Sequence, residues 1–187
     1  MIWDFTVKSV QSYKLDAVVT EDHDACVRTD VPKDLMYFLH GFLSAVSGNA
    51  TIDILRSLAE AFYRALHMFS QEVVAFLDFQ TFQTQIIIRQ KRKEMMDRMN
   101  AASGEAAAAP NGADLKLGPQ DEWVRWVCAG INGFDQLDEG IAKIADRSFG
   151  RVKQHADDYG LEYEDPIDAW LNDEVPECSS MLVDKLV

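Results

Sequence analysis

The sequence lacks long apolar runs. No stretch approaches the roughly 18 uncharged apolar residues that a membrane-spanning helix requires. The first residues also do not combine a basic region, an apolar run and a small-residue cleavage site. These absences argue against a membrane span and a secretory signal. We therefore expect an intracellular protein, either cytoplasmic or incorporated into a virion or another assembly.

Cysteine is also scarce. The chain has three cysteines, Cys26, Cys128 and Cys178. An odd number of cysteines this far apart resembles neither a disulfide framework nor a close-spaced metal site. We expect all three to be reduced thiols, with Cys128 buried.

Sequence motifs for catalysis and cofactor binding are absent. The chain has no phosphate-binding GxxxxGK(S/T) loop, no dinucleotide-binding GxGxxG, no HExxH, no CxxC, no EF-hand loop and no ExxH pair of the helical di-iron type. Residues 21–26 gather carboxylates, a histidine and a cysteine, but adjacent residues cannot all face one ion. A solvated acidic turn is therefore the preferred interpretation. We assign no catalytic, cofactor-binding or metal-binding residue and expect no cofactor.

Basic residues are outnumbered and unevenly placed. The 187 residues include 18 Lys and Arg against 31 Asp and Glu, a net charge of −13, which opposes general binding to nucleic acid or to anionic membranes. Residues 89–98 nevertheless hold five of the basic side chains. Residues 154–187 hold ten acidic residues and one basic residue, a local charge of −9. Nucleic acid is therefore an expected partner only through the 89–98 cluster.

Helical periodicity dominates what is present. With 48% hydrophobic and 26% charged residues, the chain has the composition of a globular protein. No glycine or proline occurs from residue 49 to residue 103, and apolar residues recur there at helical spacing. This pattern predicts a long helix over residues 51–100, unless a kink near residues 80–84 divides it. An unbroken helix of roughly 75 Å would project from the body or pack against a partner.

Further helices are predicted on both sides of this segment. Thr29–Pro32 is a helix start, with a capping side chain followed by proline. Residues 119–159 predict a second long helix that stops at Gly160. A short C-terminal helix begins at Asp165.

The two remaining segments are the start of the chain and the stretch between the long helices. In the first thirty residues apolar and polar side chains alternate, which predicts a β-hairpin, with a strand followed by a short helix as the alternative. Residues 101–118 are rich in small residues and contain glycine and proline, which is typical of a linker.

The predicted fold class is therefore mainly α, a long antiparallel helical hairpin or bundle with a short N-terminal β-hairpin. We treat residues 1–187 as a single domain. It comprises a β-rich N-terminal segment (1–30), a helical part with one long helix (31–100), a linker (101–118) and a helical C-terminal part with an acidic tail (119–187).

Three functional hypotheses fit these features. The first is a non-enzymatic assembly or adaptor protein that acts through protein partners, as a homo-oligomer or in a larger assembly; viral (phage) structural or assembly components and parts of secretion apparatus are often built in this way. The second is an acidic inhibitor or regulator of a basic surface, such as a DNA mimic, an immunity protein or an anti-defence protein. The third is a helical enzyme or ligand-binding domain whose pocket would be lined by Trp123, Trp126, Tyr159 and Trp170 near His155.

The first hypothesis is preferred, and its interface combines the two charged ends of the chain. A basic helix end and an acidic tail can attract each other within one fold, or can pair head to tail between copies. The ten interface residues predicted on this basis are Arg89, Lys91, Arg92, Lys93, Arg98, Asp157, Asp158, Glu162, Glu164 and Asp165.

Overall fold

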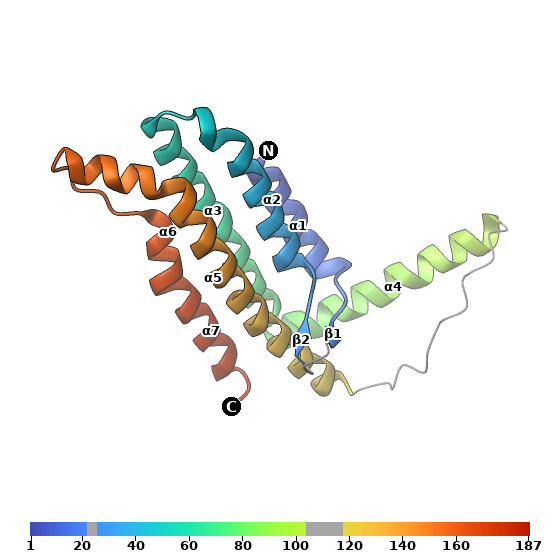
Figure 1. Ribbon diagram of the computed structural model, residues 1–187. Coiled ribbons are helices and arrows are strands. Elements are labelled where there is room, and N and C mark those ends of the chain that lie inside the picture. Colours follow the sequence, from blue (N-terminus) through green and yellow to red (C-terminus); the bar gives the residue numbers. More distant parts are fainter. Residues whose placement is uncertain (22–25, 104–117) are drawn as a thin grey trace.

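The chain folds into helices and one very small sheet (Figure 1). The computed structural model describes residues 1–21, 26–103 and 118–187. The elements are α1 (Ile2–Leu15), β1 (Thr20–Glu21), β2 (Val27–Arg28), α2 (Val31–Val46), the 3-10 turn η1 (Ser47–Asn49), α3 (Ile52–Phe76), α4 (Phe79–Ser103), α5 (Pro119–Asp158), α6 (Pro166–Ala169), the π-helical segment η2 (Trp170–Glu174) and α7 (Val175–Asp184). Because β1 and β2 pair antiparallel, the predicted mainly α class with a short N-terminal β-hairpin is confirmed.

The position of the β-hairpin differs from the prediction. Residues 2–15, part of the segment predicted as β-rich, form α1. The side chains that this segment buries, including Thr6, Ser9 and Tyr13, are three or four residues apart, which is the spacing of one helix face. Trp3, one of the alternating apolar residues, is 54% exposed. The alternation was misleading because two of the buried residues are polar.

The predicted helix over residues 51–100 is divided in two. It begins as predicted at Thr51, whose hydroxyl accepts a hydrogen bond from the backbone N–H of Ile54. A second helix, α4, begins after Asp78, whose carboxylate accepts hydrogen bonds from the backbone N–H and the hydroxyl of Thr81. This carboxylate satisfies a donor in the first turn of a new helix. The chain turns there, just before the predicted kink, and α4 leaves the other helices at a steep angle (Figure 1).

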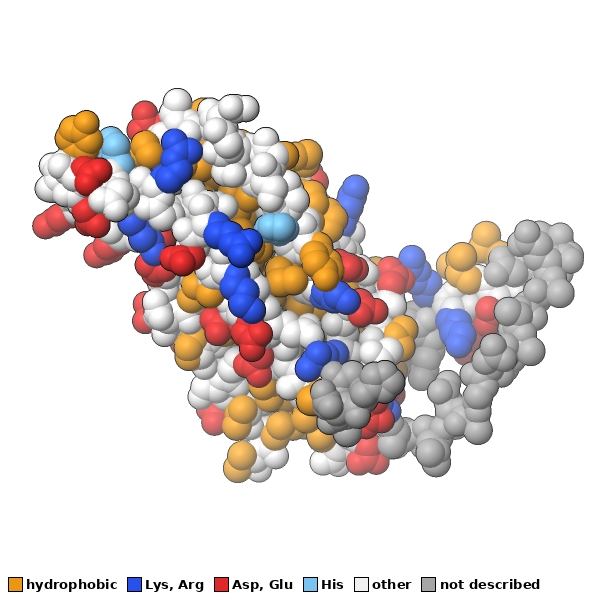
Figure 2. Space-filling model, viewed as in Figure 1, with side chains coloured by type: hydrophobic (Ala, Val, Ile, Leu, Met, Phe, Trp, Pro, Cys, Tyr) orange, Lys and Arg blue, Asp and Glu red, His pale blue; other side chains and the backbone are white. Residues whose placement is uncertain are grey.

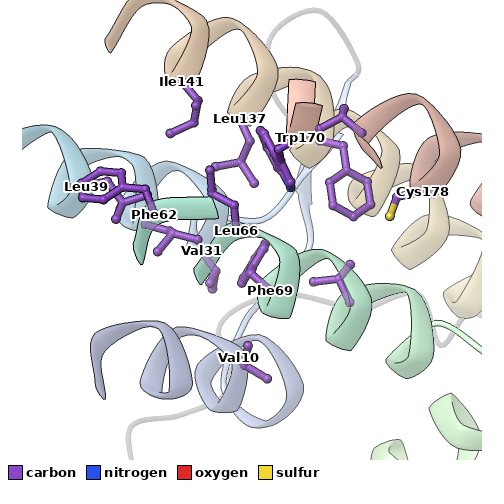
Figure 3. Packing of buried hydrophobic residues seen from close by; sticks show 14 of the residues in the cluster. Val10, Val31, Leu39, Phe62, Leu66, Phe69, Leu137, Ile141, Trp170 and Cys178 are labelled. Carbon is purple, nitrogen blue, oxygen red and sulfur yellow. The ribbon is translucent and has the colours of Figure 1, made fainter. Parts of the chain in front are cut away.

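The other helices enclose one hydrophobic core, and we call them together the helical body. In Figure 1, α5 returns antiparallel beside α3, while α1 and α2 cover one side and α7 the other. Figure 3 shows the core between them, with side chains from α1, α2, α3, α5 and the C-terminal segment pointing toward one another. Tyr13 belongs to this core, and the rings of Phe69, Phe76 and Trp126 surround it edge to face.

Two glycines allow other elements to approach α5 closely. A Cβ atom at Gly130 would lie 2.7 Å from Cδ1 of Leu77, and a Cβ atom at Gly140 would lie 1.9 Å from Sδ of Met36. Both distances are shorter than Cβ atoms tolerate. The glycines that weaken α5 as an isolated helix therefore permit its packing against α2 and the end of α3.

The C-terminal segment packs on the body. After α5 the chain turns at Gly160, whose φ of 62° lies in the left-handed region that glycine adopts readily. Trp170 is completely buried and donates from Nε1 to the hydroxyl of Ser70 at 3.2 Å. The segment η2 is π-helical: the N–H of Val175 bonds to the carbonyl of Trp170, five residues earlier. The next residue, Pro176, has no N–H to donate. The predicted helix stop at Gly160 is confirmed.

The predicted linker of residues 101–118 is only partly described. Residues 101–103 complete α4, and Gly118 precedes the first turn of α5. Residues 104–117 lie outside the described residues. In the described ranges, every helix is too short or too polar to cross a membrane.

Candidate interaction surfaces

Arg89 fixes the root of α4 against the body. Its guanidinium donates hydrogen bonds to the backbone carbonyls of Tyr13, Lys14 and Ala17 at the end of α1. It also lies over the ring of Trp126, 4.5 Å from the ring centroid. Helix-end carbonyls lack intrahelical partners, and an indole face attracts a cation, so this position suits a half-buried guanidinium. Burial lowers the pKa of Arg89. This predicted interface residue is thus engaged inside the fold.

From residue 87 onward α4 projects from the body, and we call residues 87–103 the α4 arm; Arg89, at its base, is the residue that anchors it. Every side chain from residue 90 to residue 99 is exposed. The arm nevertheless carries several large apolar side chains that are 44–60% exposed. They are Ile87, Ile88, Met95, Met96 and Met99. Ile88, Met95 and Met99 are seven and four residues apart, so they lie on one side of the helix.

The basic residues predicted as an interface have two different environments. Lys91, Lys93 and Arg98 are exposed on the α4 arm. Arg92 forms an ion pair with Asp16, with 3.2 Å between Nη1 and Oδ1. Since both of these side chains are about half exposed, the pair adds little stability but favours one orientation of the arm. Three of the five predicted basic residues are therefore presented to solvent, and two of them, Lys91 and Arg98, lie beside the apolar side of the arm.

The acidic residues predicted as an interface lie at the opposite end of the molecule (Figure 1). Asp157, Asp158, Glu162 and Glu164 are exposed around the turn from α5 to α6. We call this turn, residues 157–164, the acidic turn. Its distance from the α4 arm shows that the two do not pair within one chain.

Asp165 differs from the other predicted acidic residues because it is only 6% exposed. Its carboxylate accepts a hydrogen bond from the N–H of Ile167 at 2.9 Å and so caps α6. It also pairs with Lys153 at 3.3 Å, and Lys153 bonds in turn to Asp168 at 2.7 Å. Burial alone would lower the pKa of Lys153, but the two carboxylates outweigh it and raise this pKa. Asp165 therefore fastens α6 to α5.

A groove between α2 and α5 was missed by sequence reasoning. It has a volume of about 930 Å³ and lies where residues 33–47, from α2 and the start of η1, face α5 residues 132–148. Its apolar lining comes from Met36, Tyr37 and Ile144. The groove depends on two helices that approach each other at Gly140, so no local sequence signal could have revealed it.

The rim of this groove is basic although the chain is strongly acidic. Figure 2 shows several Lys and Arg side chains and a histidine along the face that α2 and α5 form. Lining residues with basic side chains are Arg28, Lys33, His40, Lys143 and Arg147, against the acidic pair Asp135 and Glu139. Glu139 pairs with Lys143 at 3.9 Å, but both are more than three quarters exposed, so the pair neutralises the rim only weakly. The groove can accept an anionic group beside an apolar one.

The aromatic residues of the third hypothesis do not form a pocket. Trp123 is buried and donates from Nε1 to the carbonyl of Leu77 at 2.9 Å. Trp126 and Trp170 belong to the core, whereas Tyr159 is 71% exposed. The structure therefore corrects the expectation that these four side chains line one site.

The remaining predicted features are the cysteines and the acidic segment at residues 21–26. Cys178 is buried, and burial raises the pKa of its thiol to about 11, which makes it a poor nucleophile. Cys128, expected to be buried, is only partly so. In the acidic segment at residues 21–26, residues 22–25 lie outside the described residues.

The described residues thus offer surfaces for binding: an exposed helix, an acidic turn and a basic groove. Within those residues, no cluster of three or more His, Cys, Asp or Glu side chains could hold a metal ion. Comparison with protein-family models, with curated proteins and with solved structures finds no match to this chain.

Proposed function

We propose that this chain is a non-enzymatic assembly or adaptor protein that acts by protein–protein contact through the α4 arm. The observation that carries the proposal is the exposed apolar side of a helix that leaves the body. Groups of large exposed apolar side chains often mark binding sites, and the arm carries five such side chains. Methionine is especially frequent at surfaces that adapt to partners.

The stability of the arm supports the same proposal. An isolated helix of about 12–15 residues is marginal in water, and most helices are held by packing of one apolar face. Residues 90–99 have exposed side chains throughout, so the body does not supply that packing. A partner that covers Ile88, Met95 and Met99 would supply it.

The chemistry of the arm defines the partner. Lys91 and Arg98 lie beside the apolar side chains on the helix surface, and a helix of this type binds in a hydrophobic groove. Flanking acidic side chains on the partner would complement these two cations and speed association. The partner is therefore a protein with an apolar groove edged by carboxylates. A viral structural or assembly protein, or a part of a secretion apparatus, would use the arm in this way.

The other two hypotheses have less support. A DNA mimic or inhibitor of a basic surface needs a continuous acidic face, whereas the α2–α5 face carries Lys33, Lys143 and Arg147. A ligand-binding domain built on the C-terminal aromatic residues lacks its pocket, since Trp123 and Trp170 are buried in the core.

The test is co-migration in cell extract by size exclusion. We expect the tagged wild-type chain to elute within an assembly larger than the purified chain forms alone. Met95→Asn with Met99→Asn should shift it to the elution volume of the purified protein. Glu94→Gln with Asp97→Asn, two exposed polar changes on the same arm, should leave the assembly intact. Equal elution of all three proteins at the position of the purified chain would contradict the proposal.

A further inference from the structure

A row of exposed side chains along α5 is positively charged at one end and negatively charged at the other. It comprises Lys143, Arg147, Arg151, Gln154 and Asp158, all of them exposed. Successive members are three or four residues apart, so they lie on one side of the helix over roughly 22 Å. Two contacts hold parts of this row: Arg151 donates to the carbonyl of Ser47 at 3.3 Å, and Gln154 donates to Asp158 at 2.8 Å.

The row is complementary to itself when two copies run antiparallel. With a two-fold axis between Arg151 and Gln154, Arg147 of one copy faces Asp158 of the other. The same register places Lys143 just beyond the end of the partner's α5, beside the turn that carries Glu162. Because each contact occurs twice, the pairing closes as a dimer and does not extend into a filament.

Apolar side chains lie in the same register. Tyr159 and Leu161, in the acidic turn, are 71% and 49% exposed. In the antiparallel arrangement this turn lies over the partner's α2–α5 groove, whose apolar lining includes Tyr37 and Ile144. Exposed ion pairs alone contribute little, so burial of these side chains is needed to hold a dimer.

We propose that two copies of this chain form a reciprocal dimer through the C-terminal half of α5, with the acidic turn of each copy in the basic groove of the other. This inference rests on the proposed function, because it names a second copy of the chain as one protein partner. It concerns a surface separate from the α4 arm, so the two can be tested independently. Charge indicates what occupies the basic groove. The chain has a net charge of −13, so the acidic turn of a second copy can supply the anionic segment.

The test is light scattering with in-line size exclusion on the full purified chain over a range of concentrations. We expect a dimer at low salt that weakens as salt is raised from about 0.05 to about 1 M, because screening shortens the reach of the charges. Lys143→Glu with Arg147→Glu should weaken the dimer by roughly a hundredfold or more, since like charges would then face each other. Asp158→Lys with Glu162→Lys should do the same.

Mixing the two charge-reversed variants shows whether each loses the dimer through the proposed contact or because its fold is damaged. An equimolar mixture of the two variants should form a heterodimer, because each reversed groove then meets a reversed turn. One chain with all four substitutions should also dimerise. Lys91→Glu with Lys93→Glu, the same charge change on the α4 arm, should leave the dimer unaffected.

Three results would overturn the inference. The first is a wild-type chain that is monomeric at all concentrations. The second is a dimer that survives both reversals on α5 but dissociates in the arm variant, which would leave the proposed role of the arm standing. The third is a monomer whose groove binds inorganic phosphate, with binding lost in Lys143→Glu/Arg147→Glu, which would assign the groove to a small anion.

Discussion

The guanidinium of Arg89 lies 4.5 Å from the ring centroid of Trp126, and this contact joins the root of α4 to the first part of α5. The same guanidinium closes the end of α1 by bonding to the carbonyls of Tyr13 and Lys14 in its last turn and to the carbonyl of Ala17 just beyond it. A single side chain therefore connects α1, α4 and α5. The direction in which the α4 arm leaves the body depends on it.

Replacing Arg89 should destabilise the fold. Arg89→Met keeps an apolar stem but removes the hydrogen bonds to α1 and the cation–π contact, at a cost of about 2–4 kcal/mol in the free energy of unfolding. Urea denaturation followed by tryptophan fluorescence measures this. Arg98→Met, an exposed change on the same helix, should stay within about 0.5 kcal/mol of the wild type. If both variants lost the same amount of unfolding free energy, the claim that Arg89 is anchored to the body while Arg98 is not would be contradicted.

Two glycines of α5 should respond in opposite ways to alanine. A Cβ atom at Gly130 would lie 2.7 Å from Leu77 Cδ1 and 3.1 Å from Leu182 Cδ1, so Gly130→Ala should destabilise by about 1–3 kcal/mol through overpacking. At Gly150 nothing lies within 4 Å. Gly150→Ala should therefore stabilise by about 0.5–1 kcal/mol, since alanine favours helix. Thermal denaturation of both variants is the measurement, and a loss at both positions would contradict the close approach at Gly130.

Alkaline pH should destabilise the junction of α5 and α6. Burial, assisted by the carboxylate of Asp165, raises the pKa of Tyr163 to about 12, and the pKa of Lys153 is raised as well. For groups whose folded-state pKa is raised, the contribution to stability is complete below the unfolded pKa, near 10. It is then lost as the pH rises through the folded value. The free energy of unfolding should therefore fall between about pH 10 and 12.

Tyr163→Phe tests the cause of that loss. The Tyr163 hydroxyl is buried without a hydrogen-bond partner among the described residues, so its removal should cost little near neutral pH. The variant should retain more stability than the wild type above about pH 10. Tyr37→Phe, at an exposed tyrosine, serves as the control. Superimposable urea-denaturation profiles of wild type and Tyr163→Phe across this pH range would refute the assignment.

Local signals predicted much of the secondary structure. Helices begin at the predicted positions Thr51 and Asp165, and both side chains cap them. The start of α2 is also where it was predicted, but the capping side chain expected there makes no cap hydrogen bond. The helix stop at Gly160 is equally local. The N-terminal helix was missed because Thr6 and Ser9, both polar, occupy buried positions that only tertiary packing reveals.

The candidate surfaces were less predictable for the same reason. The acidic residues and Lys91, Lys93 and Arg98 were predicted as interface residues from charge alone, and the structure shows only that all of them except Asp165 are exposed. Arg89 belongs to the same basic run, but its role depends on the end of α1, more than seventy residues away in sequence. The groove arises where Met36 meets Gly140, a contact that no sequence spacing encodes.

Site-specific photo-crosslinking of the α4 arm in the cells that make the protein tests the central claim most directly. A photoreactive phenylalanine analogue at Met95 would lie on the apolar side, whereas the same analogue at Asp97 would point to the opposite side. The account predicts one discrete crosslinked partner protein from position 95, lost when Ile88→Asn and Met99→Asn are added, and none from position 97. The same products from both positions, or none from either, would contradict a docking role for the arm.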